Sequence, residues 1–313
     1  MNDVTKLWNG RRYFSLDSYL KSAFGEKLYK LSLNGGMSCP NRDGKISFGG
    51  CIFCSSGGSG DFAYDCSTNT DKQINAAKDL VKNKFDGKRY IAYFQAYTNT
   101  YAPVTYLEKL FRPVIMRDDI AVLSVATRPD CLEDDKIELL AELAAIKPVW
   151  IELGLQTIHK KTAELINRGY DTLCYDNAVK KLKAADINVI THMIVGLPYE
   201  SCEDMIKTAE HIGMTGSDGI KIQLLHVLEN TKLAEMYRRG DFDVLSEDEY
   251  IHLVADIISV LPENIVIHRL TGDGNKKELI APKWSGDKRR VLNLINHELK
   301  VRNIIQGCSA KGK

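Results

Sequence analysis

Short apolar runs alternate with amphipathic stretches along most of this chain. Six apolar runs have the length and composition of strands: residues 28–33, 90–95, 120–126, 149–155, 189–195 and 220–225. Apolar residues recur at helical spacing between them, in residues 71–84, 104–116, 133–146, 159–167, 175–185 and 201–214. Repeated strand–helix–strand units require parallel strands with right-handed crossovers, and strands this apolar indicate a sheet covered on both faces. The pattern predicts an α/β fold, a partial (β/α)6 barrel of the TIM type, with a doubly wound open sheet as the alternative.

The chain of 313 residues is long enough for one large α/β domain. We expect residues 1–262 to form the barrel, with an N-terminal lead-in and a cysteine-bearing loop at 37–60. Residues 263–313 contain one more apolar run, 265–267, and a helical stretch near 288–302. We interpret them as a short C-terminal extension that closes the barrel within the same domain.

Composition excludes some classes of protein. The first 13 residues contain no apolar core of a signal peptide, and no stretch reaches the length of a membrane-spanning helix. The 8 cysteines are unevenly spaced and do not form the framework of a disulfide-rich secreted protein. We therefore expect a cytoplasmic protein with no membrane partner.

The formal net charge of +1 argues neither for nor against a nucleic-acid partner, because a polyanion needs only a local basic face. Basic residues gather near the C-terminus: Lys276, Lys277, Lys283, Lys288, Arg289, Arg290, Lys300 and Arg302. They form either a solvated helix face or a surface for nucleic acid.

Three cysteines, Cys39, Cys51 and Cys54, follow the first predicted strand. No nearby fourth cysteine or histidine completes a four-coordinate metal site. An iron–sulfur cluster with one iron left open for a reactant fits this set, and a structural zinc site with a distant fourth ligand is the alternative. The other five cysteines share no ligand spacing, so we expect no second cluster.

Polar residues follow the carboxyl ends of the predicted strands, where the working residues of a β/α barrel lie. The candidates on the substrate side are Tyr97, Asn99, Gln223, His226, Arg269 and Asp273. Glu152 differs from them because it lies inside an apolar strand, where a buried carboxylate needs hydrogen-bonding partners.

The cysteine set, with Gly57 and Gly58 behind it, resembles the cluster loop of radical S-adenosylmethionine (SAM) enzymes. Eleven residues separate Cys39 from Cys51, an insertion similar to that of the Elongator catalytic subunit and its bacterial relatives. The resemblance implies a [4Fe–4S] cluster whose fourth iron is chelated by SAM, and an electron from the cluster that cleaves SAM to a 5′-deoxyadenosyl radical. It also places the two glycines beside the methionine amino group of SAM, where a side chain would block the approach.

The resemblance extends to the rest of a SAM site. It implies that Glu152 accepts hydrogen bonds from the ribose hydroxyls and that Gln156 and Arg168 contact the methionine carboxylate. It further implies that the segment from His192 to Gly196 packs on the adenine.

Within the superfamily, several stretches are similar to the YhcC/YtqA-type proteins: residues 91–103, 126–132, 152–169, 224–237, 268–274 and 280–285. The chain departs from that pattern at Tyr170, Gln223 and residues 229–230, which concerns the substrate side of the site.

For this branch the resemblance implies an enzyme that converts the 5-carboxymethylaminomethyl group of a tRNA wobble uridine to 5-aminomethyl. The partners are then tRNA and a reducing electron donor such as flavodoxin or ferredoxin. Two other classes stay open: a radical SAM enzyme that acts on a small molecule such as a porphyrinogen, and a non-enzymatic iron–sulfur or zinc module.

Overall fold

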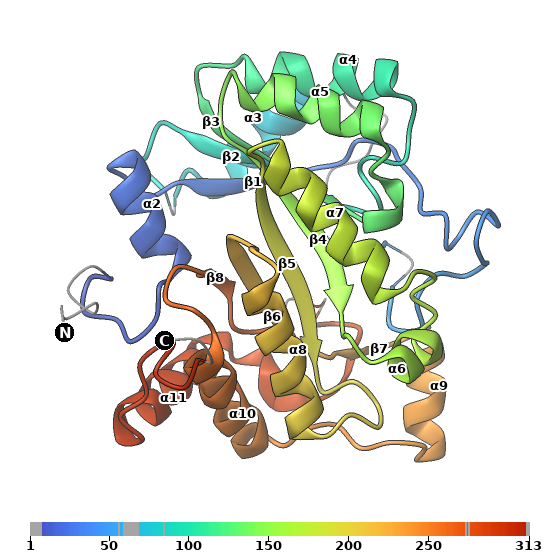
Figure 1. The fold of residues 1–313 in the computed structure, drawn as a ribbon, viewed down its shortest axis with the longest axis vertical. Helices are drawn as coiled ribbons and strands as arrows, with labels where there is room; N and C mark the ends of the chain where they lie inside the picture. Colours follow the sequence, from blue (N-terminus) through green and yellow to red (C-terminus); the bar gives the residue numbers. More distant parts are fainter. Residues whose placement is uncertain are drawn as a thin grey trace.

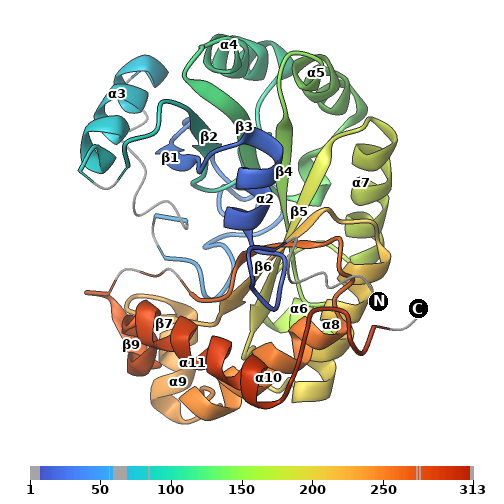
Figure 2. The ribbon, with the colours of Figure 1, turned by 90° about the vertical axis from the view of Figure 1, so that its left-hand side faces the viewer.

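The computed structural model describes residues 8–55, 57–58, 69–83, 85–272, 274 and 276–310. Its main sheet has the strand order β1-β2-β3-β4-β5-β6-β8, and every neighbouring pair is parallel. The strands are β1 (Tyr29–Leu33), β2 (Tyr90–Phe94), β3 (Ile120–Thr127), β4 (Val149–Gln156), β5 (Asn188–Val195), β6 (Gly219–Leu224) and β8 (Val266–Arg269). Figures 1 and 2 show helices along the outer side of this curved sheet. The predicted α/β partial barrel is confirmed.

Helices follow the strands and cover the outer face of the sheet. They are α3 (Thr70–Val81), α4 (Val104–Ile115), α5 (Asp134–Ala144), α7 (Thr172–Ala184) and α8 (Cys202–Met214), while the short α6 (Lys160–Leu165) lies at the carboxyl end of β4 (Figure 1). Outward-facing strand residues such as Leu123, Ile151 and Met193 are fully buried in the core that these helices close. Across the described ranges, no helix combines the length and the apolarity that crossing a bilayer requires.

The sheet has one strand more than the six that the sequence predicts. β8 comes from the C-terminal part of the chain and pairs with β6 through Gly219–Val266 and Ile220–Ile267. The strand ends in His268 and Arg269, so its apolar run is too short to predict a strand from the sequence. β1 and β8 are the two edges, and each has one neighbour in the sheet.

Several elements are not predicted by the apolar pattern: α2 (Leu16–Phe24), α9 (Lys232–Arg239), α10 (Glu247–Val260), and the antiparallel pair β7 (Val227–Leu228) and β9 (Leu279–Ala281). The start of α10 has a sequence signal for a helix N-terminus that the spacing of apolar residues does not include. The Ser246 hydroxyl accepts from the N–H of Glu249, whose carboxylate accepts from the N–H of Ser246, and this is a capping box. The predicted C-terminal helix is present as α11 (Lys288–Val301).

Helix α2 closes the N-terminal end of the half-barrel with an apolar floor (Figure 2). The floor contains Leu16, Tyr19, Leu20 and Phe24 of α2 with Leu28, Ile91, Ala121, Val122, Trp150 and Ile190. The rings of Tyr19 and Trp150 lie 6.0 Å apart, which brings the helix into contact with the inward face of β4. The interior of the barrel above this floor contains polar side chains.

Gln306 joins the C-terminal segment to the segment that precedes α2. Its backbone N–H donates to the carbonyl of Arg12, and its side-chain oxygen accepts from the N–H of Phe14 at 2.9 Å. Its side-chain amide donates to the carbonyls of Pro262 and Ile265 at 2.6 and 2.8 Å. This buried glutamine therefore fastens three separate segments at the underside of the barrel.

Candidate active site

Glu152 on β4 faces the interior of the barrel and is fully buried. Its Oε1 atom accepts hydrogen bonds from Lys30 Nζ at 2.7 Å and from Ser124 Oγ at 2.9 Å. Its Oε2 atom accepts from Lys221 Nζ and from His192 Nε2, the latter at 2.8 Å. The sequence requires partners for this carboxylate, and the protein supplies four donors for about four lone-pair sites.

Tyr93 completes a polar layer inside the barrel. Its ring centroid lies 4.8 Å from Lys30 Nζ and 4.6 Å from Lys221 Nζ. We call the following six residues the Glu152 network: Lys30, Tyr93, Ser124, Glu152, His192 and Lys221. They come from β1 to β6, one from each strand, so the network spans the curved sheet directly above the apolar floor.

The network fixes the charge of its members. Burial alone raises the pKa of Glu152, but the ammonium groups of Lys221 and Lys30 outweigh it and hold that pKa well below its usual value. Burial and the nearby Lys221 lower the pKa of His192 to about 4. Glu152 is therefore ionised and His192 neutral at pH 7, and the Nε2 proton of His192 faces the carboxylate.

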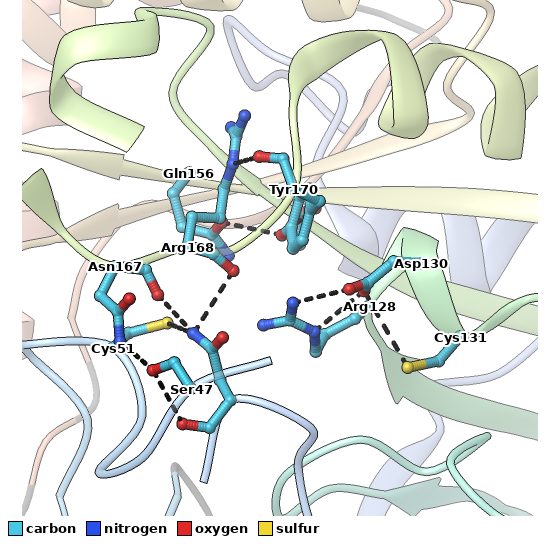
Figure 3. Close-up of polar contacts among 11 residues, drawn as sticks. Ser47, Cys51, Arg128, Asp130, Cys131, Gln156, Asn167, Arg168 and Tyr170 are labelled. Atoms are coloured by element: carbon cyan, nitrogen blue, oxygen red, sulfur yellow. Dashed lines mark hydrogen bonds and ion pairs between the residues drawn. The ribbon is translucent and has the colours of Figure 1, made fainter. Parts of the chain in front are cut away.

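Gln156 ends β4 at the mouth of the barrel in a left-handed conformation, with φ +62°. Arg168 supports this strained turn, because its Nη1 donates to the carbonyls of Leu155 and Thr157 at 2.7 and 2.5 Å. The Tyr170 hydroxyl lies 3.1 Å from Gln156 Oε1 (Figure 3). Arg168 thus lies beside Gln156, with its guanidinium buried and bound to main-chain carbonyls, and its contact with the methionine carboxylate stays a prediction.

The ring of Tyr170 lies between two guanidinium groups (Figure 3). Its centroid is 4.7 Å from Arg168 and 4.8 Å from Arg128. Arg128 in turn binds Asp130 through two hydrogen bonds of 2.9 and 2.8 Å. Arg128 directly follows β3, at one of the strand ends where the sequence predicts working residues, although it is not among the predicted site candidates.

The cysteine loop is bound to the turn that carries Arg168. The Asn167 side-chain amide donates to Ser47 Oγ at 2.8 Å and to the carbonyl of Gly50 at 2.9 Å. The Asn41 amide donates in return to the carbonyl of Asn167, and the N–H of Ile52 donates to that of Ile166 at 3.2 Å. These bonds bring the loop next to the mouth residues of β4 (Figure 3).

Two of the three loop cysteines are in direct contact. The N–H of Cys54 donates to the carbonyl of Cys51 at 3.0 Å, and the Cys54 thiol lowers the pKa of Cys51 to about 7 against the opposing effect of burial; Arg128 acts in the same direction. The Asn41 amide lies 3.7 Å from the same sulfur. Cys39 is near enough to raise the pKa of Cys54. A thiol with a pKa near 7 is about half thiolate at pH 7, far more than an ordinary cysteine, and thiolate is the form that binds iron.

The donor set fits a cluster better than a single ion. Within the described ranges, no three His, Cys, Asp or Glu side chains converge closely enough to hold one metal ion. A zinc ion with Zn–S bonds of about 2.3 Å would hold its thiolates within roughly 4 Å of one another. In an iron–sulfur cluster each thiolate binds a different iron, so three thiolates that do not converge on one point are compatible with it.

Gly58 and Tyr97 pack together behind the cysteines. Gly58 has φ +57°, and a Cβ atom on it would lie 2.2 Å from the Tyr97 ring, so only glycine fits. The N–H of Tyr97 donates to the carbonyl of Gly58 at 3.1 Å. The structure therefore places Tyr97 at the cysteine loop. Gly57 is partly exposed beside them.

The Asn99 side chain holds main-chain segments together. Its side-chain amide donates to the carbonyls of Ala96 and Ala126, both at 3.0 Å, and joins the loop after β2 to the end of β3. Gly196 likewise lies at a turn, with φ +89° and its N–H directed at Met205 Sδ at 3.0 Å.

The remaining substrate-side candidates gather around β6 and β8. Gln223 Nε2 lies 3.3 Å from His192 Nδ1, which joins it to the Glu152 network. Arg269 ends β8 and is close enough to lower the pKa of His192 further. Asp273 lies outside the described residues.

His226 packs against the loop after β8. Its Nδ1 accepts from the N–H of Gly274 at 3.2 Å, and a Cβ atom on Gly272 would lie 2.3 Å from its ring. Burial, with Lys288 as a smaller cause, lowers its pKa to about 4.

The sequence identified Glu152 as a buried polar residue of the interior but not its partners Lys30, Tyr93, Ser124 and Lys221. These four are single polar residues within apolar strands.

Two family models match most of the chain. Residues 39–212 match the model of the radical SAM superfamily, and residues 217–301 match that of the radical SAM C-terminal domain. YtqA of Bacillus subtilis is 45% identical over 297 residues, which cover 95% of this chain and 92% of that protein. YhcC of Escherichia coli strain K12 is 37% identical over 85% of each chain. The predicted similarity to this branch is confirmed.

Two further proteins are related over part of their length. The tRNA uridine(34) acetyltransferase of Methanocaldococcus infernus is 30% identical over 48% of this chain and 28% of its own. The solved structure of Elp3 from the same archaeon superposes with a TM-score of 0.68 at 18% identity, over 89% of this chain and 64% of that one. At this identity the second likeness shows the fold alone.

Proposed function

Because the chain belongs to the radical SAM superfamily, and is therefore a radical SAM enzyme that uses a [4Fe–4S] cluster and SAM, we propose that it modifies the wobble uridine of tRNA. The proposed reaction converts 5-carboxymethylaminomethyl uridine to 5-aminomethyl uridine. One observation carries the cluster-and-SAM part of the proposal. Cys51 and Cys54 are in contact, on a loop that is bound to the turn beside Gln156.

When bound, the cluster and SAM supply a 5′-deoxyadenosyl radical that abstracts a hydrogen atom from the substrate. In the net reaction the bond between the amino nitrogen and the carboxymethyl carbon breaks, water is consumed, the two-carbon unit leaves as glyoxylate, and the two electrons go to SAM. The methylene beside the carboxylate is the proposed site of hydrogen abstraction.

The residues of this chain have separate proposed roles in that reaction. Cys39, Cys51 and Cys54 bind three irons as thiolates, and the lowered pKa of Cys51 favours this form at neutral pH. Gln156 contacts the methionine part of SAM, and Arg168 supports it by holding the carbonyls on either side.

The other predicted SAM contacts keep their roles as proposals, with one difference. Gly57 and Gly58 leave room for the amino group, and the segment from His192 to Gly196 receives the adenine. Glu152 already accepts four hydrogen bonds from the protein, so a ribose hydroxyl would share its oxygens with Lys30 or Ser124.

Two observations support tRNA as the partner. A relative that matches 48% of this chain is named tRNA uridine(34) acetyltransferase. Basic residues on η2 (Lys283–Gly286) and α11 also offer phosphate contacts, since Lys283 and Arg289 are exposed. Arg290 and Arg302 contribute less, because they pair with Glu247 and Asp256.

The cluster also requires an electron donor, and we propose a small redox protein of the flavodoxin or ferredoxin class. Such donors and tRNA are both cytoplasmic, and the cysteines within the described ranges are free thiols, as a reducing compartment allows.

Anaerobic reconstitution tests the chemistry. The wild type should bind about four irons per chain and cleave SAM to 5′-deoxyadenosine and methionine. Cys54→Ala should lose both, whereas Cys308→Ala, at an exposed cysteine, should keep both. A Cys54→Ala protein with full iron and full SAM cleavage would refute the assigned ligands.

Nucleoside analysis tests the substrate. The tRNA of cells that lack this protein should accumulate 5-carboxymethylaminomethyl uridine, and the purified enzyme should convert that tRNA in vitro. An unchanged nucleoside profile, with active SAM cleavage, would reject tRNA and direct the search to small molecules.

A further inference from the structure

Lys30 is the cation of the Glu152 network that a ligand can reach. It lies on the edge strand β1, and 23% of its side chain is exposed, compared with 3% for Lys221. Its contacts with Glu152 and with the Tyr93 ring show that the ammonium is directed into the barrel. The exposed part therefore belongs to the interior face of the half-barrel at its open edge.

Lys30 has hydrogen-bonding capacity left. An ammonium group carries three N–H donors. Within the described ranges, Lys30 makes one hydrogen bond, to Glu152 Oε1, and its other close contacts are the faces of Tyr93 and Trp150 at 4.8 and 5.9 Å. Two donors remain for an acceptor that enters the barrel.

The charge of the network favours an anion. Two ammonium groups, Lys30 and Lys221, share one carboxylate, Glu152. Burial, together with the charges of Lys30 and Arg269, lowers the pKa of Lys221 well below its usual value even though Glu152 opposes this. A second carboxylate next to Lys30 would balance the charge of the layer.

We propose that Lys30 binds a carboxylate of the substrate and thereby selects a substrate with an acidic side chain over the same substrate without it. This inference rests on the proposed function, whose substrate carries a carboxylate one bond from the methylene that loses hydrogen. Holding that carboxylate fixes the methylene, so Lys30 is a specificity-determining residue. RNA phosphates stay outside the barrel, where the exposed basic residues of η2 and α11 lie.

Competition binding with two anticodon stem-loop RNAs tests this proposal. One RNA carries 5-carboxymethylaminomethyl uridine and the other 5-methylaminomethyl uridine, which lacks only the carboxylate. The reconstituted wild type with SAM should prefer the first by about tenfold or more, since a hydrogen bond to a charged group has that strength. Lys30→Gln should reduce the preference to below about threefold, and Lys30→Arg should keep most of it.

Two further measurements separate this role from a structural one. Lys27→Gln, at an exposed lysine two residues before the same strand, should keep the full preference. SAM cleavage without RNA reports separately on the SAM site of Lys30→Gln, and a uniform loss there does not change the RNA preference, because the preference is a ratio of two affinities measured on the same protein.

The outcomes distinguish the two proposals. A wild type that converts the first RNA but shows no preference, or a folded Lys30→Gln that keeps the preference, overturns the role of Lys30 and leaves the proposed function standing. A wild type that cleaves SAM but neither binds nor converts the first RNA overturns both. If Lys30→Gln does not fold, loss of the preference in a folded Lys30→Arg also overturns the role, because a binding cation is retained.

Discussion

Replacement of Glu152 by glutamine tests the central claim about the barrel interior. The substitution Glu152→Gln keeps the size of the side chain but removes the charge that Lys30 and Lys221 share. It also places an amide N–H group against donors, because both carboxylate oxygens accept hydrogen bonds in the wild type.

The expected loss of stability is large. Removing one partner of a buried ion pair costs about 3–5 kcal/mol, because an uncompensated charge is left in the interior. Lys221 is 3% exposed, so water cannot replace the lost carboxylate at that ammonium. Since whole domains are stable by roughly 5–15 kcal/mol, this is a substantial fraction of the total.

The pH dependence of the loss has a defined sign. Burial lowers the pKa of Lys221 below its usual value, and removal of Glu152 lowers it further. Between that lowered pKa and about 10.4, the unfolded chain binds more protons at this site than the folded chain does, so the stability of the variant rises with pH. Wild type shares this rise wherever its own Lys221 has lost its proton, so the gap between Glu152→Gln and wild type should not widen from pH 7 to pH 10.

Urea unfolding of the cluster-free protein measures these quantities. Glu138→Gln, at an exposed glutamate on α5, is the matched control and should change stability by no more than about 0.5 kcal/mol. Adding Lys221→Met to Glu152→Gln removes the stranded cation and should recover at least about 1 kcal/mol. A loss below about 1 kcal/mol for Glu152→Gln, or a double variant that is less stable than the single one, would refute the reasoning.

Three other outcomes are expected. Arg117 holds the pKa of Asp119 at about 2, so Asp119→Asn should lower the unfolding free energy by about 1–2 kcal/mol at pH 7, and the difference should disappear as the pH falls from about 4 through 2. Because the pKa of His226 is lowered to about 4, the folded state loses stability as the pH falls from about 6.5, and His226→Gln should recover about 1 kcal/mol at pH 5 in a denaturant titration. Asn167→Ala removes the hydrogen bonds to Ser47 and Gly50, so amide exchange in the cysteine loop should accelerate about tenfold, whereas an unchanged rate would show that the loop is held elsewhere.

The fold could be predicted from the sequence where one physical signal dominated. The strands β2 to β5 are mostly apolar, each with one inward-facing member of the Glu152 network, so their runs stand out from the amphipathic helices around them. β8 was missed because half of it faces the polar interior, and α2 was missed because its apolar face covers the floor of the barrel and does not follow a strand.

The candidate site was predictable only in part for a similar reason. Spacing along the chain identified the cysteines, since Cys51 and Cys54 are close in sequence and in space. Lys30 and Lys221 gave no such signal, because their partner is 122 residues away from one and 69 from the other. Partnerships of this kind arise from the curvature of the sheet and appear only when the strands are assembled.

The hydrogen bond between Phe14 and Gln306 joins residues that are 292 positions apart. On a ribosome that adds about 5–20 residues per second, Phe14 is made roughly 15–60 s before its partner. Until β8 is made, apolar contacts with β2 to β5 hold α2, and β8 then adds the hydrogen bond from the N–H of Ile267 to the carbonyl of Phe14 at 2.7 Å. The underside of the protein is consequently fastened in two steps, the second of which waits for Gln306.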